Sequence, residues 1–242
     1  MPIFFQKDID QDTKLGIWKI EEEELFFLQK VLPQRNVSHP HKKLQHLAGR
    51  YLLNYLFPHF PVQLILIADT RKPYLKDEAY HFSISHCGNY AAAIVSKSKR
   101  VGVDIELPSV KVEKIKHKFL SKEEMELVDR QWAMSNRRNV IDNRQEPVGN
   151  NITLQPSVKS YEQPLSDIKK LTLFWSCKEA VFKWYGLGEV DFKEHMVIEK
   201  IKQISEDGFQ TEICFKKEAS KALILDCCFF KEIVLSYVVS KS

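Results

Sequence analysis

A short alternating segment in the first half of the chain could carry metal chemistry. Residues 101–106 read Val-Gly-Val-Asp-Ile-Glu. In a strand, alternate residues share a face, so Asp104 and Glu106 would project together with Gly102 leaving space beside them. Neighbouring carboxylates repel each other and are stable with a cation between them, or with one protonated, and hard oxygen ligands suit Mg²⁺. Taken alone, the segment is more simply interpreted as a solvent-exposed polar strand face.

A second segment places charge on a predicted helix over residues 171–186. Glu179 and Lys183 are four residues apart and so share one face. Taken alone, they could form only a surface ion pair worth about 0.3–0.5 kcal/mol. If this face met the two carboxylates above, Glu179 would be a third metal ligand, and Lys178 and Lys183 would supply positive charge for phosphate or an acidic partner. An apolar stripe would hold the helix to the core: Phe174, Cys177, Val181 and Trp184.

A third segment suggests anion binding at the end of a strand. Residues 82–88 read Phe-Ser-Ile-Ser-His-Cys-Gly, with Arg-Lys-Pro upstream at 71–73. At such a turn a hydroxyl, an imidazole and backbone N–H groups can converge on a phosphate. Ser85 and His86 are not a hydrolase pair, because adjacent strand residues point to opposite faces and no G-x-S-x-G elbow is present. The alternative for His86 is an ordinary turn or core histidine.

The elements that must position these residues alternate between helix and strand. A strand ends the first twenty residues, and a helix is predicted near 41–57 from three- and four-residue apolar spacing. The remaining predictions are strands at 62–68, 80–85, 90–95 and 101–106, a helix at 111–129 with a second start at Ser121–Glu124, a polar loop or mobile insertion at 134–168, and about four strands within 196–239. Helix followed by strands occurs twice, which suggests two similar halves meeting near Glu106.

Composition excludes several classes of protein. The 242 residues are 44% apolar and 28% charged, as in ordinary globular proteins, and no run of eighteen apolar residues predicts a membrane span. Residues 1–8 lack the pattern of a secretory signal. Five scattered cysteines without a C-x-x-C pair indicate reduced thiols in a cytoplasmic protein. The net charge of +4 is too mild to demand nucleic acid, and we expect neither nucleic acid nor membrane as a partner.

The segments together, in this order, resemble the 4′-phosphopantetheinyl transferases. The resemblance is to the long, monomeric, surfactin-synthetase-activating type and covers roughly residues 40–186. Each motif is common alone, whereas the combination and its spacing are specific. It rests on Arg-Lys-Pro at 71–73, Phe-Ser-Ile-Ser-His at 82–86, Gly-Val-Asp-Ile-Glu at 102–106, Phe-Leu-Ser-Lys-Glu-Glu at 119–124 and Trp-Ser-Cys-Lys-Glu-Ala-Val-Phe-Lys-Trp-Tyr-Gly at 175–186.

The resemblance implies an α+β pseudo-dimer of two similar halves, residues 1–106 and 107–242, with the active site in the cleft between them. It implies transfer of the 4′-phosphopantetheine arm of coenzyme A to a serine of an apo acyl or peptidyl carrier protein. The reaction would be Mg²⁺-dependent and release adenosine 3′,5′-bisphosphate. We therefore expect a monomeric enzyme whose partners are coenzyme A and a carrier protein. The length and polarity of 134–168 depart from the family pattern.

By position, the resemblance also assigns roles to individual residues. Asp104, Glu106 and Glu179 match the family's Mg²⁺ ligands, and Lys183 matches the lysine near the reacting phosphate. Glu179, or Glu106 through a water, would take the serine proton. The coenzyme-binding set is Lys72, Ser85, His86, Arg50 and Lys178.

Two other functions fit the same residues. One is a different Mg²⁺-dependent phosphotransferase or a pyrophosphatase that acts on nucleotides without a carrier protein. The other is a non-catalytic module that binds an acidic partner through its lysines and arginines. A module that binds nucleic acid would not require three carboxylates in this context, and no RNP-like or zinc-finger pattern is present.

Overall fold

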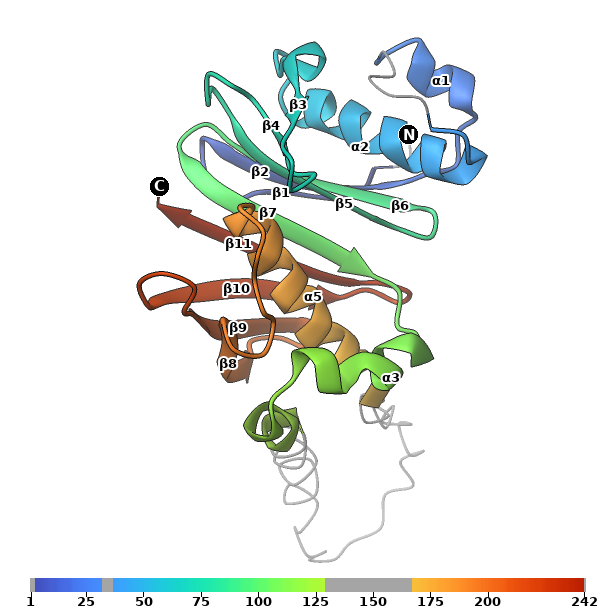
Figure 1. Cartoon of the computed structure of the whole chain (residues 1–242). Coiled ribbons are helices and arrows are strands. Elements are labelled where there is room, and N and C mark those ends of the chain that lie inside the picture. Colours follow the sequence, from blue (N-terminus) through green and yellow to red (C-terminus); the bar gives the residue numbers. More distant parts are fainter. Residues whose placement is uncertain (1–2, 32–36, 129–166, 242) are drawn as a thin grey trace, which may run out of the picture.

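The computed structural model describes residues 3–31, 37–128 and 167–241, which form a mixed α+β fold with two large antiparallel sheets and the small two-stranded sheet β3-β4 (Figure 1). Within the described residues, no helix is long and apolar enough to cross a membrane. The elements are β1 (Ile3–Asp8), β2 (Thr13–Lys19), α1 (Glu24–Leu28), α2 (Pro40–Leu56), the 3₁₀ helix η1 (Val62–Leu64), β3 (Leu66–Ile67), β4 (Pro73–Tyr74), β5 (His81–Cys87), β6 (Tyr90–Ser96), β7 (Lys99–Glu106), α3 (Val110–Phe119), α5 (Asp167–Tyr185), β8 (Met196–Gln203), β9 (Gly208–Phe215), β10 (Lys221–Phe229) and β11 (Val234–Lys241).

The first sheet has the strand order β1-β2-β6-β5, and α2 packs on it. Helix α2 confirms the predicted helix near 41–57, and Pro40 stands in its first turn, where its fixed φ favours the helix. The predicted apolar spacing places Leu52 and Leu56 against the sheet. A Cβ added to Gly16 of β2 would lie 3.2 Å from both leucine side chains, so the glycine lets helix and sheet approach closely.

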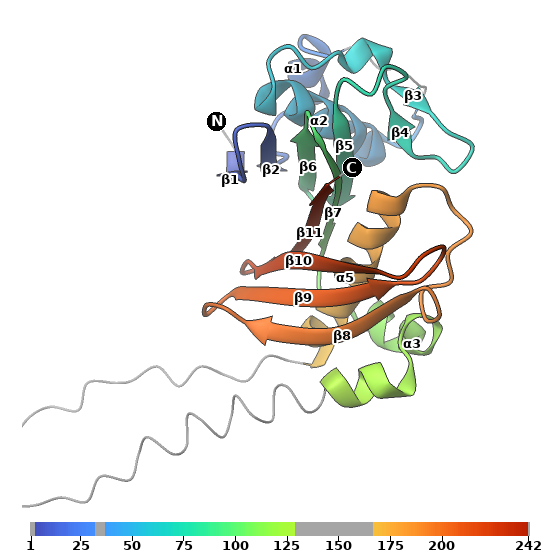
Figure 2. The ribbon, with the colours of Figure 1, turned by 90° about the vertical axis from the view of Figure 1, so that its left-hand side faces the viewer.

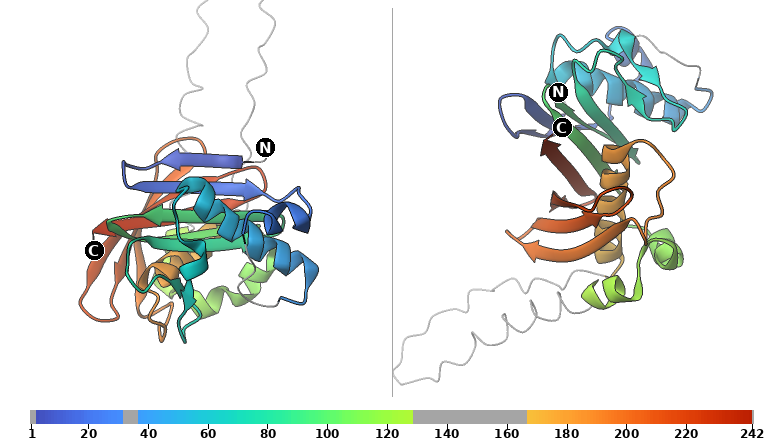
Figure 3. Two further views of the ribbon diagram at one scale, coloured as in Figure 1. Left: turned by 90° about the horizontal axis from the view of Figure 1, so that it is seen from above. Right: turned by 60° about the vertical axis from the view of Figure 1, so that its left-hand side comes forward.

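The second sheet has the order β7-β11-β10-β9-β8, with α5 running along one face of it (Figure 2). The stripe predicted for α5 is buried throughout, and Phe174, Cys177 and Val181 are at most 1% exposed. Helix α3 packs beside α5, at the end of the sheet away from α2 (Figures 1 and 3). The four strands predicted within 196–239 are confirmed as β8 to β11.

The two sheets meet where β5 lies beside β7, and serine side chains join them there. The backbone N–H of Val103 donates to Ser83 Oγ, and that of Ile105 donates to Ser85 Oγ, each at 3.2 Å. Among the described strands, β7 has its backbone ladder with β11 and none with β5. The junction is therefore made by hydroxyl groups that substitute for carbonyl acceptors.

One local prediction was wrong, and a second is confirmed together with the interruption that its sequence indicated. Residues 62–68 do not form a buried strand: η1 is followed by the two-residue strand β3, and Leu66 and Ile67 are about half exposed. The apolar run resembles a buried strand, but only part of it is covered by α2 and β5. The helix predicted at 111–129 is interrupted at Leu120, and residues 122–128 form a separate helix.

The capping box explains that interruption. Glu124 accepts a 2.8 Å hydrogen bond from the Ser121 backbone N–H, and Ser121 Oγ accepts one from Glu124. The second start predicted at Ser121 is thus confirmed. The polar stretch predicted at 134–168 lies outside the described residues up to position 166, and α5 begins at Asp167.

Candidate active site

Strand β7 presents its two acidic residues toward α5. The predicted alternation is confirmed for the core, because Val101, Val103 and Ile105 are buried between the sheets. On the opposite face Gly102 lies against the helix, and a Cβ there would collide with the Ala180 carbonyl oxygen. This close approach carries the neighbouring carboxylates into the space between β7 and α5.

Asp104 is 2% exposed and is held by groups from two other elements. The Lys183 ammonium on α5 donates to Asp104 Oδ1 at 2.6 Å, and the Ser85 hydroxyl on β5 donates to the same oxygen at 2.9 Å. Lys183 also donates to Ser85 Oγ at 2.8 Å. Within the described residues, Asp104 Oδ2 is buried with no hydrogen-bond partner. Three predicted site residues from three distant segments therefore meet at one carboxylate.

Glu106 and Glu179 belong to the same electrostatic cluster. Burial raises the pKa of Glu106 to about 7, with the Asp104 charge adding to it and the 3.1 Å hydrogen bond from Trp175 Nε1 opposing it. Burial likewise raises the pKa of Glu179 to about 7, with Asp104 again the next cause and Lys183 opposing it. The Asp104 charge therefore adds to the effect of burial on both glutamates, and the Lys183 charge only partly offsets these two causes.

The cluster fits a hard divalent cation in its donor chemistry. All three candidate ligands are carboxylates, one of their oxygens is buried without a partner, and added positive charge would relieve the raised pKa values. As they stand, no three acidic, histidine or cysteine side chains of the described ranges converge closely enough to hold one metal ion. The positive charge at Asp104 comes from Lys183 instead. Binding a cation would therefore require side chains in the cluster to reorient.

A cavity of about 330 Å³ adjoins the cluster. Glu179 and Lys183 line it from α5, and residues 70–73 and 82–84 line it from the first half of the chain. A smaller cavity of about 160 Å³ lies on the other side of Pro73, and Arg50, Arg71 and His86 line it. The segment 71–73 thus borders both spaces, and the predicted coenzyme-binding residues line one or the other, apart from Ser85 and Lys178.

Lys72 bridges the two halves of the chain beside the cleft. Its ammonium donates to the Trp184 carbonyl at 3.2 Å, and the neighbouring Thr70 hydroxyl donates to the Gly186 carbonyl at 2.9 Å. Gly186 has a φ of +73°, and its missing Cβ leaves the room that the Lys72 side chain occupies. Burial, with a smaller contribution from the Arg100 charge, lowers the pKa of Lys72 to about 8. A bound anion beside Lys72 would stabilise its charged form and so offset the effect of burial.

Ser85, His86 and Arg50 occupy different depths of the site. Ser85 is buried at Asp104, whereas His86 is exposed and lines the smaller cavity. Arg50 is 6% exposed, and its Nη1 lies 3.1 Å from His46 Nδ1, which accepts because a guanidinium can only donate. The structure therefore brings Arg50 and His86 to one cavity.

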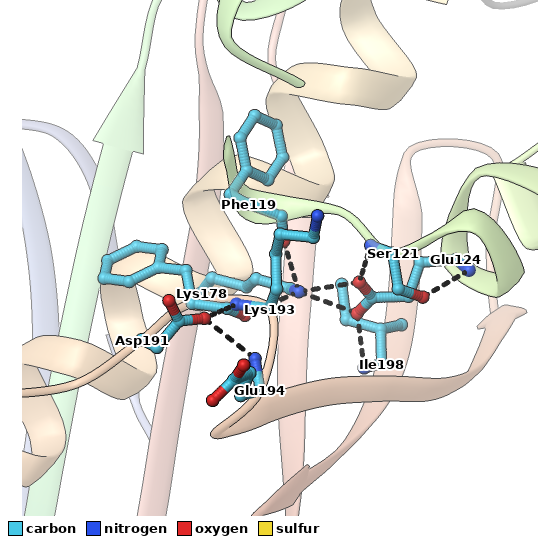
Figure 4. A network of polar contacts seen from close by, with 9 residues as sticks. Phe119, Ser121, Glu124, Lys178, Asp191, Lys193, Glu194 and Ile198 are labelled. Atoms are coloured by element: carbon cyan, nitrogen blue, oxygen red, sulfur yellow. Dashed lines mark hydrogen bonds and ion pairs between the residues drawn. The ribbon is translucent and has the colours of Figure 1, made fainter. Parts of the chain in front are cut away.

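Lys178 lies outside this site, which corrects its assignment to the coenzyme-binding set (Figure 4). Its side chain is fully buried and forms a 2.7 Å ion pair with Glu124. The same ammonium donates to the carbonyls of Phe119 at 2.6 Å and Phe192 at 2.9 Å, so its three protons are used. Glu124 also accepts from the backbone N–H groups of Ser121 and Ile198. Lys178 therefore fastens α5 to the neighbouring helix and to β8.

The sequence motifs included Trp175 and Arg71, but sequence reasoning assigned neither residue a role in the site. Trp175 fixes Glu106 through its indole N–H, and its ring packs against Phe119 and Phe192. Arg71 lines both cavities with a φ of +67°. The helical position of Trp175, one turn before Glu179, could have indicated its role. No sequence signal marks the left-handed backbone of Arg71.

The fold and this cleft agree with a comparison to protein families. A model of the 4′-phosphopantetheinyl transferase superfamily matches residues 100–228, which is more than half of the chain. The protein belongs to this superfamily. A comparison with curated proteins found no match. The matched region contains the three carboxylates and Lys183, whereas Lys72, Ser85, His86 and Arg50 precede it.

Proposed function

We propose that the protein transfers the 4′-phosphopantetheine arm of coenzyme A to a serine hydroxyl of an apo acyl or peptidyl carrier protein. The serine oxygen forms a bond to the phosphorus that carries the pantetheine arm. The bond from that phosphorus to the bridging oxygen of the diphosphate breaks, and adenosine 3′,5′-bisphosphate leaves with the electron pair. The observation that carries the proposal is the meeting of Asp104, Lys183 and Ser85 at a cleft shared by both halves, in a chain of this superfamily.

The cationic residues account for binding of a diphosphate with a further phosphate. The Lys183 ammonium lies 2.6 Å from Asp104 and also lines the cleft. There it stabilises the charge that develops on the leaving diphosphate oxygen. Lys72 offers a second ammonium at the same cavity. Arg50 and His86 line the adjoining smaller cavity and suit the phosphorylated nucleoside end. Ser85 is hydrogen-bonded to both Asp104 and Lys183 and so helps to hold them in place.

Asp104, Glu106 and Glu179 would hold Mg²⁺. When bound, the ion would neutralise diphosphate charge and make phosphorus more open to attack. The residues themselves also prepare the site without it. Without a ligand, Trp175 donates a hydrogen bond to Glu106, and Ser85 donates one to Asp104.

Glu179 is the best-placed proton acceptor for the attacking serine. It lines the reaction cavity beside Lys183, on the face of α5 that the substrate would contact. Glu106, acting through a water, is the alternative acceptor. General-base help of this kind contributes typically about 10²–10⁴-fold to a rate. As the new phosphoester bond forms, the proton of the serine hydroxyl moves to the Glu179 carboxylate.

We further infer that the fold is a pseudo-dimer of the surfactin-synthetase-activating type, with halves 1–106 and 107–242 and a monomeric cytoplasmic protein as the working form. Each half has a sheet with a helix packed on it, α2 on the first and α5 on the second. Strand β7, at the end of the first half, has its ladder with β11 of the second. A boundary at Glu106 therefore leaves the halves interlocked.

Mass spectrometry of purified apo carrier proteins tests the function. Each carrier is incubated with coenzyme A, Mg²⁺ and the protein, and the expected product is a carrier heavier by one phosphopantetheine group. Comparison of fatty-acid, polyketide and peptide-synthetase carriers would identify the class that is served. Hydrolysis of nucleotides without modification of any carrier would contradict the proposal and favour a phosphotransferase or pyrophosphatase. Binding of coenzyme A without either reaction would favour a non-catalytic module.

A further inference from the structure

The largest of the cavities described lies next to the reaction cleft and is distinct from it. It has a volume of about 450 Å³ and lies at the carboxyl end of α5, between β4, β7 and β11. Four residues line both this cavity and the 330 Å³ cleft: Lys72, Pro73, Phe82 and Gly186. The two spaces are therefore separated only by this shared wall. None of the three candidate metal ligands lines the larger one.

The larger cavity is strongly biased toward positive charge. Its lining contains four cationic side chains and one carboxylate, that of Glu78. The cations come from four separate segments, so no single helix or loop accounts for them: Lys72, Arg100, Lys221 and Lys241. Without a ligand these charges repel one another, and the Arg100 charge contributes to the lowered pKa of Lys72. An anion in the cavity would relieve that repulsion.

Trp184 positions two of these cations. The Arg100 guanidinium lies 5.2 Å from the centre of its ring, and the Lys221 ammonium lies 5.1 Å from it. The indole N–H donates to Ser240 Oγ at 2.9 Å, which fixes the ring. Cation–π contacts order both side chains before a ligand binds, which lowers the entropy lost on binding.

Aromatic side chains form a further part of the lining. Tyr74, Tyr80 and Phe82 come from the first half of the chain, and Tyr185 comes from the end of α5. The Tyr185 hydroxyl donates to Glu218 at 2.9 Å and so does not seek a partner in the cavity. The cavity thus combines apolar walls with cations. This combination suits a short carbon chain that ends in an anion.

We propose that this cavity binds the thiol end of the coenzyme and favours acyl-coenzyme A whose acyl group ends in a carboxylate. The inference rests on the proposed function. The pantetheine arm is attached to the phosphate that reacts beside Lys183, and this cavity is the space next to that site, across the wall that contains Lys72 and Gly186. The nucleoside end has the smaller cavity with Arg50 and His86. Arg100 and Lys221 would pair with the terminal carboxylate.

Two coenzyme A thioesters matched in length provide the test. Succinyl- and butyryl-coenzyme A have acyl groups of the same length, and only the first ends in a carboxylate. Calorimetric titration of the full chain, without carrier protein, should give about tenfold tighter binding of the succinyl thioester at low salt. The preference should shrink as salt is raised, because the cavity is open to solvent. Equal affinity for the two thioesters would overturn the inference.

The variant Arg100→Gln/Lys221→Gln should bind the two thioesters equally, and Lys221→Gln alone, on an exposed side chain, should lose part of the preference. Lys202→Gln on β8 is a control that should keep the wild-type preference, because Lys202 is exposed and does not line the cavity. A preference that survives in the double variant would also overturn the inference. If free succinate binds alone and the succinyl thioester gains nothing, the cavity binds a separate anion and the inference fails.

Binding and transfer separate this inference from the proposed function. Preferential binding of the succinyl thioester with no modification of any carrier protein would remove the function and leave the cavity's specificity. Transfer from coenzyme A with equal binding of the two thioesters would remove only the specificity. Failure to bind coenzyme A or either thioester would overturn both.

Discussion

Lys183 on α5 donates a 2.6 Å hydrogen bond to Asp104 on β7, although 79 residues separate them in the sequence. Both residues also bond to Ser85, so one point of contact joins β5, β7 and α5. Asp104 is almost completely buried, and its charge is tolerated because Lys183 and Ser85 compensate it. Of the three groups, Lys183 also lines the adjoining cavity, which a diphosphate could enter. This arrangement makes the acidic cluster both a structural junction and the candidate reaction centre.

Replacement of Asp104 tests the acidic cluster. Asp104→Ala should lower Mg²⁺-dependent transfer by at least about a hundredfold while the chain stays folded, because a charge that the reaction uses is lost. Activity is measured by mass spectrometry of the carrier, and folding by circular dichroism and thermal unfolding. Glu199→Gln, at an exposed carboxylate on β8, is the control and should retain activity. Full activity of Asp104→Ala would end this assignment.

The same substitution at two lysines of α5 should mainly affect different properties: stability at Lys178 and transfer activity at Lys183. Lys178→Met leaves the Glu124 carboxylate buried without its partner, and should lower the free energy of unfolding by about 3–5 kcal/mol. Lys183→Met should abolish transfer, and it should also lower stability because Asp104 is left buried with the Ser85 hydroxyl alone. Chemical denaturation and transfer assays on both variants measure the contrast. The double variant Lys178→Met/Glu124→Gln should recover part of the lost stability, and a Lys178→Met protein of wild-type stability would contradict the buried pair.

Binding of coenzyme A should take up protons near pH 8. Lys72 has a pKa of about 8 in the free protein, and a bound phosphate would raise it. Binding at pH 8 should therefore take up about half a proton through Lys72, and affinity should fall as pH rises above 8. Calorimetry in buffers of different ionisation enthalpy measures this uptake. Lys72→Met should remove it, and uptake that is identical in the variant would show that another group titrates.

The same lysine has a defined effect on stability. Its pKa is lower in the folded protein than the ordinary value of 10.5, so between about pH 8 and 10.5 the unfolded chain binds more protons than the folded one. The Lys72 contribution to the free energy of unfolding therefore rises with pH across that window. Denaturation of the wild type and Lys72→Met at several pH values should show a difference in slope there. A wild type whose stability rises no more steeply than that of the variant would contradict the lowered pKa.

Close approach of β7 and α5 can be tested at a glycine. Gly102→Ala places a Cβ against the Ala180 carbonyl, and backbone atoms cannot move aside easily. We expect a loss of about 1–3 kcal/mol in stability together with reduced transfer, because the helix that carries Glu179 must shift. Gly16→Ala is the matched control, since its Cβ would meet the ends of aliphatic side chains, those of Leu52, Leu56 and Ile3, and no backbone atom. Equal effects of the two substitutions would show that α5 tolerates displacement.

The sequence predicted most elements near the site because their apolar periodicity is strong. The alternation of residues 101–106 predicted which side chains enter the core, and the spacing in α5 predicted that Glu179 and Lys183 share a face. The prediction of a buried strand at 62–68 was wrong, because the apolar composition of this segment does not reveal that Leu66 and Ile67 remain exposed. Apolar content predicts burial only where a partner surface exists.

Lys178 shows a different limit of sequence reasoning. It is adjacent to Glu179, and adjacent helical residues point about 100° apart, so both could not face the cleft. Its partner Glu124 was visible only as part of a capping box, and nothing in the spacing indicated a contact across 54 residues. The junction of β5 with β7 was equally hidden, since serines that accept backbone hydrogen bonds leave no periodic pattern.

That junction differs from an ordinary sheet in how it can evolve. A ladder between backbones survives almost any exchange of side chains, whereas Ser83 and Ser85 hold Val103 and Ile105 with single hydroxyl oxygens. One nucleotide change at either serine codon can delete such an oxygen or lengthen its reach. These hydrogen bonds between the two sheets therefore depend on side chains. Selection can strengthen or weaken them by single substitutions that leave the backbone pairing within each sheet unchanged.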